Sequence, residues 1–148
     1  MWNRSKSLAL SIFCTRLFAL LLAVGVCAAP AIVNWYFGGG IVAQSLHLPF
    51  QITIYVCAVP GYILLYCLHV LLKNIRAGNV FVTKNTKMLR IISWSCIAVG
   101  LITFAAGFFY VSFFLVAVAC AFFALIIRVI KNVFEQAIEL KSENDFTI

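Results

Sequence analysis

The chain has 148 residues, of which 65% are hydrophobic and only 10% are charged, and its formal net charge is +7. A mean hydropathy of +1.10 excludes an ordinary soluble domain. All four acidic residues follow residue 134, so the membrane-spanning part of the chain has no carboxylate for a proton relay or a cation-coupling site.

Four apolar stretches are long enough to cross a bilayer, which takes roughly 20 residues each. They predict spans at residues 17–37, 50–72, 91–110 and 111–130. Residues 88–130 would make one helix of roughly 65 Å, about twice the hydrocarbon thickness, so we expect a turn near residues 107–112. The sequence therefore predicts an all-α integral membrane four-helix bundle.

The cations predict the orientation of these spans. Every Lys and Arg precedes the first span, lies between the second and third, or follows residue 127, whereas residues 38–49 and the expected turn carry no charge. The positive-inside rule then makes both termini cytoplasmic, an N-in/C-in topology. We expect residues 131–148 to extend the fourth span as an amphipathic cytoplasmic helix.

The first span has a second interpretation. Arg4, Lys6 and the Val26-Cys27-Ala28 triplet also fit a cleavable signal peptide. Pro30 at the junction and the apolar residues that continue to Tyr36 favour an uncleaved anchor. Whether this span is ever cleaved stays open, and the other three spans keep their orientation in both cases.

Small residues at helical spacing predict where the helices pack closely. The third span has the clearest such stripe, and weaker ones lie on the fourth and first spans: Ser93, Cys96, Gly100, Thr103 and Gly107; Ala117, Ala121 and Ala124; Ala19, Ala23, Cys27, Pro30 and Asn34.

The second span carries a candidate intramembrane polar seam, formed by Tyr55, Tyr62, Tyr66 and His69 on one helical face. We expect Pro60-Gly61 to interrupt this helix, kink it and free a backbone carbonyl. In one interpretation the seam lines a small cavity or ligand site. In the other, the phenols hydrogen-bond to neighbouring helices and His69 sits at the cytoplasmic interface.

The remaining composition argues against catalysis. The two histidines are 22 positions apart and on opposite sides of the predicted membrane, and the six cysteines form no C-x-x-C motif. No G-x-S-x-G sequence is present. We therefore expect no enzymatic activity, no metal and no cofactor.

The segment between the second and third spans is basic and should attract anionic lipid. Gly78 suits the C-terminal end of a helix at positive φ, and Thr83 or Asn85 suits the N-cap of the next. Glu135 and Glu139, after the fourth span, lie where a helix dipole disfavours acids, so we expect them to face the basic segment.

Two motifs at this face resemble a known family. Residues 78–82 (GNVFV) with Asn85 and Leu89-Arg90, and residues 130–135 (IKNVFE) with the end 143–148 (ENDFTI), resemble the bacterial membrane-protein family of unknown function 2975. The resemblance runs over essentially the whole chain, with Phe146 in place of an expected Leu. It implies a bacterial inner-membrane protein without known catalytic residues, often encoded beside a small helix-turn-helix regulator.

These features lead to two functional hypotheses. The first is a regulatory or adaptor protein that docks a small DNA-binding regulator, without itself contacting nucleic acid. The second is a small permeation or export component, or a protein of membrane immunity or resistance, built on the polar seam. The candidate docking face of the first comprises Arg76, Gly78, Phe81, Asn85, Arg90, Glu135, Glu139, Glu143, Asp145, Phe146 and Ile148.

Overall fold

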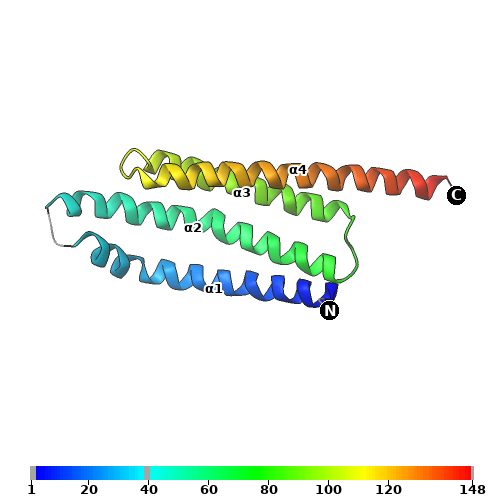
Figure 1. Cartoon of the computed structure of the whole chain (residues 1–148), viewed down its shortest axis with the longest axis horizontal. Coiled ribbons are helices and arrows are strands. Elements are labelled where there is room, and N and C mark those ends of the chain that lie inside the picture. Colours follow the sequence, from blue (N-terminus) through cyan, green and yellow to red (C-terminus); the bar gives the residue numbers. More distant parts are fainter. Residues whose placement is uncertain (1–2, 39–40, 148) are drawn as a thin grey trace.

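The computed structural model describes residues 3–38 and 41–147, and these ranges form four long helices (Figure 1). They are α1 (Arg4–Phe37), α2 (Ile41–Arg76), α3 (Thr83–Ala106) and α4 (Ser112–Phe146). Each contains a stretch long and apolar enough to cross a membrane. The predicted all-α bundle of four candidate transmembrane helices is confirmed, and the chain has the build of a multi-pass membrane protein.

The helices alternate in direction, so the chain ends and connections gather at two opposite ends (Figure 1). The N-terminus, residues 77–82 and the C-terminus lie at one, which we call the charged end. The α3–α4 turn and the end of α1 lie at the other, the aromatic end. Within the described ranges only consecutive helices bring Cα atoms within 8 Å of each other, so the bundle is built in chain order.

The helices are longer than a bilayer requires. With 34 residues, α1 extends about 51 Å, against roughly 30 Å of hydrocarbon. It begins at Arg4 rather than near residue 17, and α4 continues without a break to Phe146. Two helices therefore carry regular structure well beyond the lengths that hydropathy marks out.

Small residues bring α3 and α4 together as predicted. A Cβ added at Gly100 would lie only 3.4 Å from Cys120 Cβ and 3.6 Å from the Ala117 carbonyl oxygen. The Ser93 hydroxyl is buried and donates to the Ala124 carbonyl at 3.0 Å. The turn falls at residues 107–111, inside the expected region.

The stripe predicted on the first span is mostly wrong. Cys27, Pro30 and Asn34 are exposed, and the residues that α1 buries are Ile12, Thr15, Ala29 and Val33. The physical reason is that the buried face is shifted by one residue, so α1 buries the small Ala29 rather than Pro30, and α2 contributes a further small residue, Gly61. Leu22 of α1 lies 3.3 Å from where a Cβ of Gly61 would stand, so α1 needs no small residue there.

The expected interruption of α2 is also wrong, because the helix runs continuously through Pro49 and Pro60. At the first proline, the Thr53 hydroxyl donates to the Pro49 carbonyl at 2.7 Å. At the charged end, buried Cys67 and Leu71 of α2 pack with Leu89 and Ile92 of α3. Ile127 and Phe134 of α4 pack against this cluster, which links three helices beneath the charged end.

Candidate functional site

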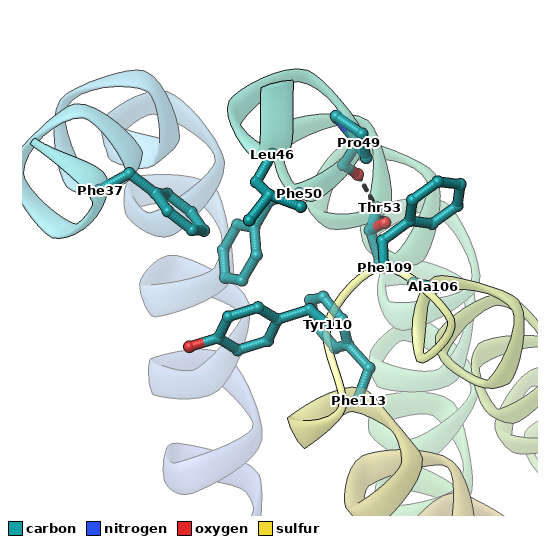
Figure 2. Close-up of a pocket in the computed structure, with 9 residues that line it drawn as sticks. All are labelled: Phe37, Leu46, Pro49, Phe50, Thr53, Ala106, Phe109, Tyr110 and Phe113. Carbon is teal, nitrogen blue, oxygen red and sulfur yellow. Dashed lines mark hydrogen bonds between the residues drawn. The ribbon is translucent and has the colours of Figure 1, made fainter. Parts of the chain in front are cut away.

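The aromatic end holds a tight ring cluster rather than a binding pocket (Figure 2). Phe37 of α1, Phe50 of α2 and Tyr110 of the turn have ring centroids 5.4 to 6.1 Å apart. The space among them is about 10 Å³, no more than one water needs. The hydroxyls of Tyr36 and Tyr110 share a hydrogen bond, which raises the pKa of Tyr110.

At the charged end, Asn85 holds the α2–α3 connection in place. Its amide nitrogen donates to the carbonyls of Asn79 and Val80, at 2.8 and 2.7 Å. Its amide oxygen accepts from the Asn74 side chain at 2.9 Å. Asn85 is 0% exposed. Its assignment to a docking face is therefore wrong, because a partner cannot reach a side chain that is buried against its own loop.

The expected helix cap at the start of α3 is likewise absent. The N-cap position is Val82, without a side-chain hydrogen bond, and the Thr86 hydroxyl donates to the Thr83 carbonyl instead. The asparagine at the third helical position turns its amide toward the loop. A cap would need the Asn85 side-chain oxygen to accept from a backbone N–H. That oxygen accepts from the Asn74 side chain instead, while the amide nitrogen donates to the two loop carbonyls.

Gly78 ends α2 in the predicted left-handed conformation, with φ of 86°. The Asn79 amide donates to the Asn74 carbonyl and the Gly78 amide donates to the Ile75 carbonyl, at 3.0 and 3.1 Å. This pair of bonds is a Schellman motif, which satisfies carbonyls that the helix end would leave unpaired. Asn74 thus contributes both its backbone and its side chain to the connection.

Glu135 of α4 faces the start of α3, as expected, whereas Glu139, for which the same was expected, is exposed and forms no ion pair with the described residues. The Glu135 carboxylate lies 3.3 Å from Arg90 and 3.2 Å from Lys131. Phe134 precedes Glu135 in the sequence, and its ring lies 5.5 Å from the ring of Phe81. Three residues of the predicted docking face, Phe81, Arg90 and Glu135, therefore lie at this contact between α3 and α4. Lys131 and Phe134, which were not predicted to belong to the docking face, also form part of it.

The last three turns of α4 project beyond this contact. Glu139, Glu143 and Asp145 are exposed, and in the described part of the chain the ion pairs involve only Glu135 among the acids. Leu140 and Phe146 are 66% and 88% exposed. Ile148 lies outside the described residues. Arg76 and Gly78 lie elsewhere, beside the start of α1, where they line a groove of about 540 Å³ with Asn3, Ser5 and Leu8.

The polar seam separates into two parts. Tyr62, Tyr66 and His69 line a groove of about 280 Å³ between α1 and α2, together with Thr15 and Arg16. Tyr55 is outside this groove and accepts a hydrogen bond from Gln51 at 3.3 Å. The Nδ1 atom of His69 is buried, and none of the described residues forms a hydrogen bond with it. Arg16 is the component that sequence reasoning missed, since it comes from a different helix.

A second polar concavity lies between α3 and α4 at the charged end. It has a volume of about 320 Å³, and it is lined by Arg90, Ser93, Trp94, Arg128, Lys131 and Asn132. Only Arg90 of this set belonged to the predicted docking face. Within the described ranges, no three His, Cys, Asp or Glu side chains gather as a metal site, so cations rather than metal ligands define the polar chemistry here.

The comparisons with known proteins identify a family but no characterised relative. No curated protein and no solved structure matches the chain. Residues 42–148 match the family model described as Protein of unknown function (DUF2975). This match covers α2, α3, α4 and both motifs at the charged end, while α1 lies outside it. Because it spans more than half of the sequence, the chain belongs to the DUF2975 family.

Proposed function

We propose that this protein is a non-enzymatic regulatory adaptor of the bacterial inner membrane, which docks a small DNA-binding regulator at its charged end. The observation that carries the proposal is the projecting end of α4. Glu139, Glu143 and Asp145 are exposed there without an ion pair to the described residues, and Leu140 and Phe146 expose apolar surface that another protein could cover.

The proposed orientation places the charged end in the cytoplasm. Its support is the distribution of cations, which flank the connection 77–82 and the start of α1 and are absent from the turn 107–111. In this orientation the projecting end of α4 is accessible to cytoplasmic proteins, whereas the ring cluster lies at the opposite interface, where aromatic residues are enriched.

The chemistry of the projecting helix favours a basic partner with an apolar groove. An amphipathic helix binds such a groove through apolar side chains on one face. Leu140 offers such a side chain, and Phe146, six residues further along α4, adds an apolar contact at the tip of the helix. The carboxylates of Glu139, Glu143 and Asp145 complement cations at the rim, which steer association and set specificity. DNA-binding regulators carry such cations, and small helix-turn-helix proteins are the partners that the family resemblance implies.

The test is affinity capture of the full-length protein from native membranes, with the bound proteins identified by mass spectrometry. We expect a small DNA-binding protein that is retained by the intact chain and lost from a chain lacking residues 136–148. This truncation keeps Glu135 and its ion pairs. The matched point variant is Leu140→Ser with Phe146→Ser, and the control is Lys84→Gln with Lys87→Gln. Equal recovery of every DNA-binding protein by all chains would refute docking through α4.

The groove between α1 and α2 favours a second candidate function, in permeation, export or membrane protection. It combines two phenols, an imidazole and Arg16 in a volume of about 280 Å³, enough for part of a small amphipathic molecule. Tyr62→Phe with Tyr66→Phe keeps the volume and removes both hydroxyls, and Tyr55→Phe is the matched control outside the groove. Reduced flux or resistance only in the double variant would support this function, whereas unchanged values at normal expression would contradict it.

A further inference from the structure

The cleft between α3 and α4 has an excess of positive charge. Arg90, Arg128 and Lys131 line it, and Glu135 is the one acid in contact with these cations among the described residues. The Lys131 side chain is only 15% exposed, so its ammonium is held in the cleft rather than extended into solvent. Subtracting one carboxylate from three cations leaves a local charge of +2, which suits an anionic group.

An aromatic side chain flanks this charge. The guanidinium of Arg128 lies 5.8 Å from the ring centre of Trp94, a cation–π distance that keeps the cation at the rim of the cleft. Tryptophan and arginine are both typical of the headgroup level of a bilayer. The residues that shape the cleft are therefore those expected at a lipid headgroup.

The position of the cleft along the helices agrees with this level. On α4, Arg128 and Lys131 lie about 24 and 28 Å along the helix from Ser112, which follows the turn. A similar length separates a cation from the aromatic end on α1, where Arg16 lies about 30 Å from Tyr36 of the ring cluster. The hydrocarbon layer is about 30 Å thick. When the aromatic end lies at one membrane interface, the cleft therefore lies at the opposite interface.

A separate apolar groove lies between the same two helices, nearer the aromatic end. It has a volume of about 260 Å³, and its walls are Ile97, Leu101 and Phe104 of α3 with Ala117, Val118 and Ala121 of α4. Trp94, Ile97 and Leu101 share one face of α3 at helical spacing. On α4, Val118, Ala121 and Arg128 lie toward one side of the helix, at spacings of three and seven residues. The charged cleft and the apolar groove therefore lie on the same side of the α3–α4 pair, with the groove at the level of the predicted hydrocarbon.

We propose that this cleft and groove form a binding site for one anionic phospholipid. Its phosphate contacts Arg128 and Lys131, and one acyl chain lies in the groove against the small residues Ala117 and Ala121. The phosphate competes with Glu135 for Lys131 and Arg90, so lipid binding weakens the contact between α4 and the start of α3. This site does not depend on the docking of a protein partner.

The headgroup is tested by native mass spectrometry of the full-length protein in a neutral detergent, titrated with phosphatidylglycerol, phosphatidylcholine or inorganic phosphate. Arg128→Gln with Lys131→Gln should weaken phosphatidylglycerol binding at least tenfold, because losing one charge-assisted hydrogen bond already costs about tenfold. The control Lys84→Gln with Lys87→Gln removes the same charge outside the cleft and should change affinity less than about twofold. If the double variant is misfolded, Arg128→Gln alone serves, since this side chain is exposed.

Separate variants test the acyl-chain groove and the competition between the lipid phosphate and Glu135. Ala121→Phe fills the groove and should weaken a long-chain lipid but not a dihexanoyl lipid, whereas Ala119→Phe on another face should affect neither. Glu135→Gln should tighten phosphatidylglycerol binding, because the competing carboxylate is lost. Equal losses in the cleft and control variants would overturn the site in favour of general surface charge. Binding of phosphatidylcholine as strong as phosphatidylglycerol, displacement by an equal concentration of inorganic phosphate, or weaker binding by Glu135→Gln would also overturn it.

Discussion

Replacing Asn85 with alanine should cost more stability than any other single polar substitution at the charged end. The side chain is fully buried and makes three hydrogen bonds, to Asn79, Val80 and Asn74. Each is worth about 1 kcal/mol net, so their loss amounts to about 3 kcal/mol. Water can reach the exposed Asn79 once the amide is gone, which keeps the cost from rising further.

Two matched substitutions beside Asn85 should cost less stability than Asn85→Ala. Asn74→Ala removes one of the three bonds and keeps the backbone carbonyl that closes the Schellman motif, so it should cost about 1 kcal/mol. Asn79→Ala keeps the carbonyl that accepts from Asn85 and changes only an exposed side chain, so it should stay within about 0.5 kcal/mol of the parent.

The assay is equilibrium unfolding of the full-length protein in detergent, followed by tryptophan fluorescence. Hydrogen exchange of the amides in residues 77–82 gives a local readout, and we expect these amides to lose protection in Asn85→Ala before the helices do. A cost for Asn85→Ala no larger than that for Asn74→Ala would refute the reasoning, because it would mean that the two loop carbonyls gain nothing from the buried amide.

Three further predictions concern the ends of the helices. Gly78→Ala should destabilise by about 1 kcal/mol in the same unfolding assay, because φ is 86° and no neighbour is within 4 Å of an added Cβ, and Gly78→Asn should cost less. Gly107→Ala should cost about 1 to 3 kcal/mol, because its Cβ would lie 2.7 Å from the Phe114 ring, and adding Phe114→Leu should recover part of the loss. In an alkaline absorbance titration, Tyr110 should ionise above the ordinary value of about 10, and Tyr36→Phe should lower its pKa. Since the folded-state pKa of Tyr110 is raised, its contribution to stability is present below pH about 10 and is lost as the pH rises through the raised value.

The polar contacts at the charged end show where sequence reasoning stops. That Gly78 ends a helix at positive φ follows from local backbone chemistry, and it was predicted correctly. Asn85 is also a local residue, but its role depends on a loop that folds back over it, so a capping rule assigned it wrongly. The pairing of Glu135 was expected because a helix dipole disfavours an acid at that position and the α2–α3 segment is basic. That it pairs with Arg90 in particular required the rotation of α4 about its axis.

The same limit applies to the packing faces. The stripe on α3 was found because its residues are small and regularly spaced, and the small size of Ser93 and Gly100 allows the close approach to α4. The face of α1 was missed because small residues occur on several of its faces, and only the contact with α2 selects the face that holds Ala29. The face that a helix buries is a property of the pair, and a single helix's sequence reveals it only when its small side chains share one face.

By itself the sequence determined that this protein has four apolar helices, where the chain turns between the last two, and that its charges gather at one end. These properties are sums over neighbouring residues, so tertiary structure cannot change them. Only the tertiary structure decided that Asn85 is buried, that Arg16 joins the tyrosines of α2, and that Arg90, Trp94, Arg128 and Lys131 surround one cleft. Each of these depends on how two helices are rotated and aligned against each other, which side-chain packing sets and hydropathy does not encode.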